Sequence, residues 1–245
     1  MNTDGNEIHL SVIIPAHNEE TRLRESLQKI FAFLDQQAFS SEVLVVENGS
    51  SDRTLEIARE AAEEQDKLRV FQELRRGKGL AVRRGMLEAR GAYRFFCDAD
   101  LSMPIDEVVK FLPSPERPDV EVAIASREAP GSVVHNRRAH RGLTGKAFNL
   151  IVRLLLLPGL RDTQCGFKCF RADVAECIFS RQVINSMAFD VELLYIARRK
   201  GYRILEIPIT LYLDTDSRVR LFRDSARMAM DLLAIRRNWR RGVYD

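Results

Sequence analysis

Long apolar runs are missing from this sequence. In its 245 residues, no stretch reaches the roughly 18 apolar residues that a membrane-spanning helix needs. A signal peptide is not evident either, because residues 1–7 are polar and the apolar stretch behind them is interrupted at Pro15. Both absences predict a protein that is soluble or attached to a membrane surface only peripherally.

Cysteine and net charge are also low. The four cysteines include only one close pair, Cys165 and Cys169, whereas a zinc site would need a second such pair. We therefore expect buried thiols in a reducing compartment. The formal net charge of +3 gives the whole chain no strong attraction for nucleic acid, although its basic residues are unevenly placed.

The chain does contain enough apolar material for a sizeable core. With 245 residues, of which 45% are hydrophobic, it can build one substantial α/β domain with a modest appendage. We expect a flexible segment at 1–8, one domain at 9–213 and a helical segment at 214–245.

Short apolar runs alternate with helix signals through the first half of the chain. The runs lie at 11–14, 43–46, 68–71 and 93–97. Segments with apolar residues at helical spacing separate them. Asn18 is the expected cap of the first helix, and Ser51 or Asp52 that of the second. Apolar strands separated by helices predict a mostly parallel central sheet with helices on both faces.

Polar groups gather directly after these runs. Asp98 and Asp100 follow the last run, and carboxylates at this spacing can flank one divalent cation, which neutralises a diphosphate. Glu19 and Glu47 suit ribose hydroxyls, and Lys78 supplies positive charge to phosphate. Since ligands bind at the carboxyl ends of parallel strands, these groups predict one nucleotide cleft. Solvated aspartates, helix caps and turn glycines explain each loop separately, but not the shared rim.

A series of motifs resembles family 2 glycosyltransferases with the GT-A fold. The motifs lie at 12–20, 46–52, 76–79, 98–100, 161–168 and 189–194. The last two are similar to the dolichyl-phosphate β-glucosyltransferase branch, one of several groups of polyprenyl-phosphate glycosyltransferases. The series covers roughly residues 9–213, and its order is far more specific than any single motif.

The resemblance implies a Rossmann-like GT-A α/β fold and an enzyme that binds a nucleotide-sugar donor. The positions that match the family's donor site are Pro15, Ala16, Asn18, Glu19, Glu47, Gly49, Asp52, Lys78 and Asp98. Asp98 and Asp100 match the catalytic pair that holds the diphosphate through Mg²⁺ or Mn²⁺, with Asp100 as the direct metal ligand. One departure is Glu47-Asn48, where many members have two aspartates. Another is the absence of the amino-terminal membrane helix of eukaryotic glucosyltransferases.

Arginines dominate the segment after a further predicted strand at 120–125. They are Arg127, Arg137, Arg138 and Arg141, with His135 and His140 beside them and Glu128 as the single acid. Guanidinium groups suit phosphate oxygens, and family members place acceptor-phosphate arginines in the corresponding loop. The resemblance therefore makes these four arginines the candidates for binding a polyprenyl-phosphate acceptor. A solvated basic loop is the alternative.

Two further segments bear on a membrane surface. Residues 148–157 are apolar almost all round, as in a buried helix or one lying in a membrane interface. Between Ser217 and Arg241, arginines interleave with apolar residues, which predicts a basic amphipathic helix that docks on the domain or rests on an anionic membrane surface. Because aromatic stacking residues are almost absent there, nucleic acid is not an expected partner. We expect peripheral attachment at the cytoplasmic, inner face of a membrane.

The expected activity is metal-dependent, inverting transfer of a sugar, with glucose from UDP-glucose favoured, onto a dolichyl-type polyprenyl phosphate. A phosphate monoester is already an anion at pH 7, so it needs no strong protein base. A hydroxyl acceptor would need one, with Asp190 and Glu192 as candidates. Asp190 otherwise supports the sugar site or caps the following helix, and Asp162 and Gln164 either support the cleft or close a turn.

Other activities are alternatives. GDP-mannose or UDP-GlcNAc can replace the donor, and a hydroxyl can replace the acceptor, within the same family. A nucleotidyltransferase would have a glycine-rich triphosphate loop where this chain has residues 15–19. A nucleotide or polyprenyl-phosphate binding protein without activity would not need both Asp98 and Asp100. The sequence carries no sign of an oligomeric state.

Overall fold

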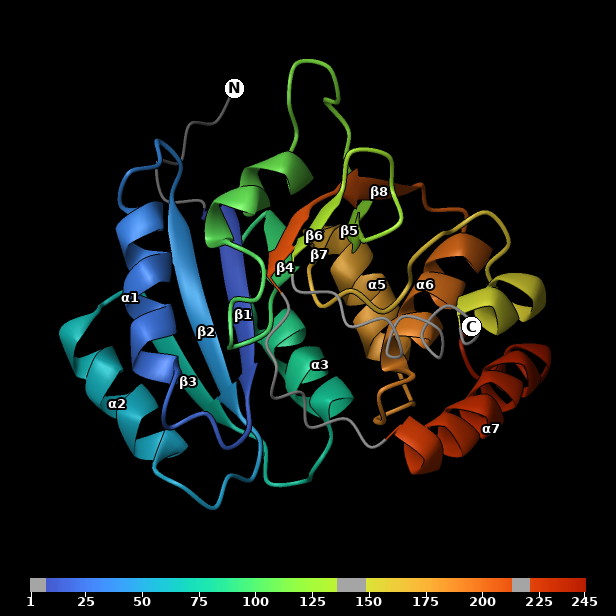
Figure 1. Ribbon diagram of the computed structural model, residues 1–245, viewed down its shortest axis with the longest axis horizontal. Coiled ribbons are helices and arrows are strands. Elements are labelled where there is room, and N and C mark those ends of the chain that lie inside the picture. Colours follow the sequence, from blue (N-terminus) through green and yellow to red (C-terminus); the bar gives the residue numbers. More distant parts are fainter. Residues whose placement is uncertain (1–7, 136–148, 213–220) are drawn as a thin grey trace.

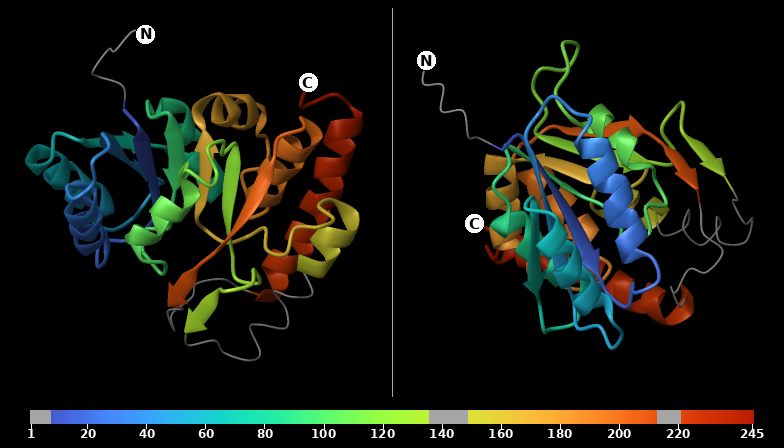
Figure 2. Two further views of the ribbon diagram at one scale, coloured as in Figure 1. Left: turned by 90° about the horizontal axis from the view of Figure 1, so that it is seen from above. Right: turned by 90° about the vertical axis from the view of Figure 1, so that its left-hand side faces the viewer.

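The computed structural model describes residues 8–135, 149–212 and 221–245, with the backbone alone for 221–229. Its elements form a central sheet with helices packed on both sides (Figure 1; Figure 2). No helix within these ranges is long and apolar enough to cross a lipid bilayer. Residues 1–7, where we expect a flexible segment, lie outside the described part.

The main sheet is mixed but largely parallel. Its strand order is β3-β2-β1-β4-β7-β5-β8. The strands are β1 (Leu10–Ala16), β2 (Ser41–Glu47), β3 (Leu68–Gln72), β4 (Tyr93–Phe96), β5 (Val122–Ser126), β7 (Lys168–Arg171) and β8 (Ile204–Pro208). Only β7 runs antiparallel to its neighbours, β4 and β5. The predicted fold class is confirmed, and every apolar run that predicts a strand overlaps an observed one.

A second, small sheet pairs β6 (Val133–His135) with β9 (Thr210–Tyr212) in parallel. His135 stacks on Tyr212 there, with ring centroids 4.6 Å apart. The pairing places β6, which follows β5 in the chain, beside β9, which follows β8.

Helices cover both faces because successive residues of a strand point to opposite sides. The helices are α1 (Leu23–Leu34), α2 (Thr54–Glu64), α3 (Lys78–Glu88), the 3₁₀ helix η1 (Ile105–Phe111), α5 (Ala172–Arg181), α6 (Phe189–Arg199) and α7 (Leu221–Arg240). Val12 and Ile14 face the core under α1, α2 and η1, whereas Ile13 faces the core under α3, α5 and α6. The sheet is therefore buried on both sides, as its apolar strands predict.

The predicted caps of the first two helices are both wrong, because Arg22 and Arg53 occupy the cap positions. Asn18 is not the cap of α1, because the helix begins five residues later, at Leu23. Asn18 instead adopts a left-handed φ of 56° and accepts a hydrogen bond from the Ser51 backbone N–H at 2.9 Å. Neither Ser51 nor Asp52 is the cap of α2, because Arg53 occupies that position and no side chain caps the helix. Asp52 lies one residue earlier, where its Oδ1 accepts from the backbone N–H of Thr54 at 3.0 Å.

Two helices lie where the sequence predicts membrane-related segments. In the described part of α7, Leu232 and Ile235 are buried against the domain, while Arg236 and Arg240 are exposed. The helix therefore docks by its apolar face, one of the two expected arrangements. Residues 149–155 form a second helix that is neither fully buried nor fully exposed.

The cysteines behave as expected. All four are free, and Cys97, Cys165 and Cys169 are buried. Burial raises the pKa of the Cys165 thiol to about 12, so the reactive thiolate does not form at neutral pH.

Candidate functional site

A hollow of about 400 Å³ opens at the carboxyl ends of β1, β2 and β4. Among the residues that line it are the predicted donor-site and metal-site residues Pro15, Ala16, Glu19, Lys78, Asp98 and Asp100. The N-terminus of α3 and Met187, which precedes α6, complete its walls. The structure thus brings the strand-end groups to one rim, as a nucleotide cleft requires.

Asp98, which lines this hollow, is in close contact with residues on two sides. The ammonium group of Lys78, at the start of α3, forms an ion pair with Asp98 Oδ1. On the other side, a Cβ atom added to Gly166 would lie only 2.1 Å from Asp98 Oδ2. Only a glycine at position 166 lets the backbone come this close to the carboxylate.

Asp100 lies further out, where solvent reaches it. Its Oδ1 accepts a hydrogen bond from the Ser102 backbone N–H at 3.0 Å, across a turn in which Leu101 has a left-handed φ of 46°. Asp98 is half-buried and Asp100 is exposed, with Ala99 buried between them. The two carboxylates therefore sit at different depths on one short turn.

Asn48 positions the segment that leads to Lys78. Its Nδ2 donates to the carbonyl oxygens of Glu73 and Arg75, at 3.0 and 2.7 Å. Its Oδ1 accepts from the Gly77 backbone N–H at 2.8 Å. All these bonds hold residues 73–77 against the end of β2, a role that the sequence analysis did not assign to Asn48.

Four predicted donor-site residues are not among the residues that line the hollow. They are Asn18, Glu47, Gly49 and Asp52. Asn18 and Asp52 tie the loop after β1 to the loop after β2, since Asp52 Oδ2 also accepts from the Glu20 backbone N–H at 3.2 Å. Gly49 has the left-handed φ of 64° that its turn requires.

Glu47 ends β2 with its side chain 1% exposed. Its Oε1 accepts a hydrogen bond from the Ser50 backbone N–H. Its Oε2 is buried and has no partner within the described part of the chain. A buried oxygen of this kind calls for an explanation, and a ligand hydroxyl is one.

Asp190 lies in the first turn of α6 and is not its cap. Ala188 occupies the cap position, and no side chain caps this helix. Asp190 instead forms a buried ion pair with Lys168, whose Nζ lies 2.6 Å from Asp190 Oδ1 and 2.6 Å from the Cys165 carbonyl oxygen. Burial raises the pKa of Asp190 above its ordinary value, although Lys168 and Lys78 oppose the rise.

Glu192, the other candidate base, is not among the residues that line the hollow. It is fully buried, and its oxygens accept from the backbone N–H groups of Val183 and Ile184. The Tyr244 hydroxyl donates to Glu192 Oε1 at 2.7 Å. These structural hydrogen bonds occupy the carboxylate of Glu192, and its role as a base stays a prediction.

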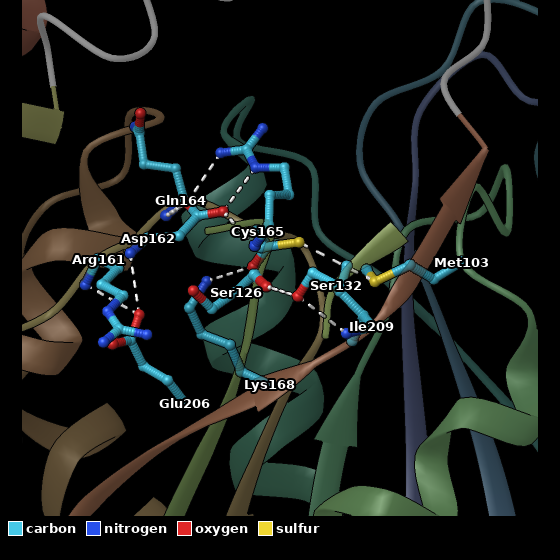
Figure 3. A network of polar contacts seen from close by, with 11 residues as sticks. Met103, Ser126, Ser132, Arg161, Asp162, Gln164, Cys165, Lys168, Glu206 and Ile209 are labelled. Carbon is cyan, nitrogen blue, oxygen red and sulfur yellow. Dashed lines mark hydrogen bonds and ion pairs between the residues drawn. The ribbon is translucent and has the colours of Figure 1, made fainter. Parts of the chain in front are cut away.

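Arg127 is held by the buried carboxylate of Asp162, which Figure 3 shows near Gln164 and Glu206. Its Nε and Nη2 donate to the two oxygens of Asp162 at 2.5 and 2.8 Å. Asp162 also accepts from the Gln164 backbone N–H, and its own N–H donates to Glu206. Burial alone would raise the pKa of Asp162, but the contacts with Arg127 hold it below its ordinary value. Asp162 is thus a support of Arg127, while the other predicted acceptor residues, Arg137, Arg138 and Arg141, lie outside the described residues.

Residues 11–179 match the profile of a known family, Glycosyl transferase family 2. The chain belongs to glycosyltransferase family 2. This glycosyltransferase is 33% identical to the dolichyl-phosphate beta-glucosyltransferase of Dictyostelium discoideum, over 97% of this chain and 76% of that protein. It is 36% identical to the protein of the same name from Drosophila melanogaster, over 95% of this chain and 76% of that protein.

A solved structure shares the fold of this glycosyltransferase. The TM-score is 0.67 with the crystal structure of glucosyl-3-phosphoglycerate synthase from Mycobacterium tuberculosis in complex with Mn²⁺ and UDP-glucose. The two chains are 19% identical, and the match covers 93% of this chain and 79% of the other. The fold is GT-A, as the resemblance in the sequence implies.

We call the hollow described above the donor hollow, because predicted donor-site residues line it. Its carboxylates fit a hard divalent cation that is shared with a diphosphate. Within the described ranges, no group of three or more histidine, cysteine or acidic side chains forms a complete protein cage for a metal. Mg²⁺ does not need one, since one or two carboxylates together with phosphate oxygens and water complete its shell. Asp98 and Asp100, which both line the hollow, would supply those carboxylates.

Proposed function

We propose that this glycosyltransferase moves glucose from UDP-glucose onto a dolichyl-type polyprenyl phosphate, with inversion at the anomeric carbon and with Mg²⁺ or Mn²⁺. The observation that carries the proposal is the identity, along almost the whole chain, to proteins named dolichyl-phosphate beta-glucosyltransferase. The UDP-glucose and Mn²⁺ bound by the glucosyl-3-phosphoglycerate synthase of the same fold support the choice of donor and metal.

The donor hollow supplies the groups that a departing diphosphate needs. Asp98 and Asp100 would hold the metal ion, and the bound ion would neutralise charge on the leaving group. Burial lowers the pKa of Lys78, but the carboxylates of Asp98, Asp190 and Asp100 more than offset this, so its pKa is raised. Lys78 therefore stays protonated and can bind phosphate oxygens. Glu47, with its unpartnered buried oxygen, is the proposed contact of the ribose.

The acceptor side is assigned to Arg127. Asp162 fixes two of its nitrogens and leaves Nη1 without a partner among the described residues, so the guanidinium group is oriented before an anion arrives. Its side chain is 33% exposed, which leaves a face open to phosphate. We assign Arg137, Arg138 and Arg141 to the same phosphate on the strength of the sequence.

Asp190 is assigned a supporting role beside the donor sugar. Its ion pair with Lys168 lies close enough to Lys78 and Asp98 for their charges to act on its pKa. An acceptor phosphate is an anion before it reacts, so no base is required of this buried carboxylate. Asp190 and Lys168 then form a structural ion pair near Asp98.

We further propose that the chain works at the inner face of a membrane, attached peripherally. The helix at 149–155 buries Val152 but leaves Leu154 75% exposed, and α7 presents several exposed arginines. An apolar face beside basic residues suits an anionic bilayer surface. Flotation with anionic liposomes tests this, because removal of Arg236, Arg237, Arg240 and Arg241 together should release the protein.

The decisive experiment offers radiolabelled UDP-glucose, UDP-GlcNAc and GDP-mannose in parallel, with polyprenyl phosphate as acceptor. A metal-dependent, organic-extractable product is expected from UDP-glucose. It should disappear in Asp100→Asn and persist in Asp106→Asn, which neutralises an exposed aspartate outside the hollow. Transfer only to a hydroxyl acceptor, or only from another donor, would overturn the proposal.

A further inference from the structure

A second hollow of about 400 Å³ lies between the helix at 149–155, α6 and α7. These elements lie side by side in Figure 1 and in the left view of Figure 2. The walls are Leu155, Leu156 and Pro158 on one side and Tyr195, Arg198, Arg199 and Arg236 on the other. The second hollow shares no residue with the donor hollow, and no carboxylate lines it.

The arginines of the second hollow are oriented by uncharged groups. Arg199 lies over the rings of Tyr195 and Trp239, 5.3 and 5.4 Å from their centroids, and donates to the Tyr195 hydroxyl at 3.1 Å. Arg198 donates to the Pro158 carbonyl oxygen. No carboxylate of the described chain pairs with them or with Arg236. Three guanidinium groups therefore border one hollow without a carboxylate partner among the described residues.

Exposed apolar side chains lie on the elements that border the second hollow. Leu155, which lines it, is 44% exposed, and its neighbours Leu154 and Ile151 are 75% and 43% exposed. One turn before Arg236 on α7, Leu233 is 64% exposed. Several large exposed apolar side chains on adjoining elements indicate an interaction surface rather than ordinary solvent contact.

We propose that the second hollow binds the phosphate of an anionic phospholipid headgroup while the leucines around it enter the bilayer interface. Guanidinium groups match phosphate oxygens, and the exposed apolar side chains match a lipid whose acyl chains begin just below its headgroup. A soluble phosphate compound would use the arginines but not the leucines, so the combined surface favours lipid. This inference rests on the peripheral attachment proposed above, but not on the glycosyl transfer.

Matched pairs of variants separate a specific site from general basic charge. The test pair is Arg198→Gln with Arg236→Gln, and the control pair is Arg237→Gln with Arg240→Gln, which removes the same charge from exposed positions of α7 outside the hollow. Binding is measured by co-sedimentation with phosphatidylcholine vesicles, with and without phosphatidylglycerol. General attraction to an anionic surface loses about fivefold in affinity per arginine removed. The test pair should lose about tenfold more than the control pair, because charge-assisted hydrogen bonds are lost as well.

The outcomes are distinguishable. If the wild-type chain ignores phosphatidylglycerol vesicles, the proposed membrane attachment fails. If it binds them and both pairs weaken equally, only the second hollow is refuted. Calorimetric titration with inorganic phosphate tests the other source of the anion. If the test pair no longer binds inorganic phosphate but binds vesicles as tightly as the control pair does, the hollow is a site for free phosphate and the lipid assignment is overturned. If Arg198→Gln lowers the melting temperature, the single variants Arg236→Gln and Arg237→Gln replace the test pair and the control pair in the same comparison.

Discussion

Replacing Lys168 with methionine removes one partner of a buried ion pair and keeps the length of the side chain. The Lys168 side chain is fully buried, and that of Asp190 is 4% exposed. The ring of Phe96 lies 5.4 Å from the ammonium group, so an apolar side chain has a place to pack. Methionine carries no charge, so the buried carboxylate of Asp190 loses its positive partner.

The expected loss follows from that uncompensated charge. Removing one member of a buried pair costs about 3–5 kcal/mol, against a total stability of about 5–15 kcal/mol for a typical domain. Burial already raises the pKa of Asp190, and loss of Lys168 raises it further. When the pKa of Asp190 is higher in the folded chain than in the unfolded chain, the folded chain keeps a proton that the unfolded chain has released. The free energy of unfolding of the variant therefore falls as the pH rises above about 3.9, the ordinary pKa of an aspartate. The deficit of Lys168→Met should therefore be larger at pH 8 than at pH 5.

Urea unfolding at both pH values measures this deficit. Lys67→Met is the control, because Lys67 pairs with Asp35 at 2.9 Å on the surface, where the two side chains are 49% and 58% exposed. Such a pair contributes about 0–1 kcal/mol. Adding Asp190→Leu to Lys168→Met should recover much of the loss, since an apolar pair replaces buried ions at little cost. A Lys168→Met variant no less stable than the control at either pH would refute the reasoning.

Two further predictions concern close contacts. Gly166→Ala should lower kcat/KM about tenfold to a hundredfold, because its Cβ would displace the Asp98 carboxylate. Gly159→Ala is the control: its Cβ meets nothing within 4 Å, but its φ of 95° disfavours alanine, so it should lower the melting temperature and leave kcat/KM near that of the parent. Tyr244→Phe should cost about 1.5–3 kcal/mol at pH 8.5 and less at pH 6, because burial raises the pKa of Glu192 to about 7 and the lost hydrogen bond is strongest to the ionised form. Thermal unfolding at the two pH values checks this, and a cost independent of pH contradicts it.

The elements and the donor loops were predictable because their signals are local. An apolar run such as 43–46 reads as a buried strand whatever surrounds it, and the polar group that follows necessarily lies at the carboxyl end. Asp98 and Asp100 could thus be placed from the sequence. The predicted cap at Asn18 failed for a reason that is not local: its side chain bonds to Ser51, in the loop after the neighbouring strand.

Long-range partners account for the remaining errors. Asp190 fits the pattern of a cap, yet Lys168, 22 residues earlier, binds its carboxylate instead. For Arg127 the phosphate-binding role stays a prediction, but its partner Asp162, 35 residues later, was missed. Neither partner can be chosen from spacing, because each depends on which strands become neighbours in the sheet.

One strand decides both of these pairings. β7 lies between β4 and β5 and runs antiparallel to them, so Lys168 at its beginning pairs with Phe96 and Ile124 near their ends. The loop that precedes β7 must therefore lie at the edge where the loops after β4 and β5 lie. That is why residues 162–168 supply Gly166 to Asp98, Lys168 to Asp190 and Asp162 to Arg127. A short segment thus sets the relative positions of the proposed leaving-group, sugar and acceptor groups, and a shift of β7 by one register would disturb all three together.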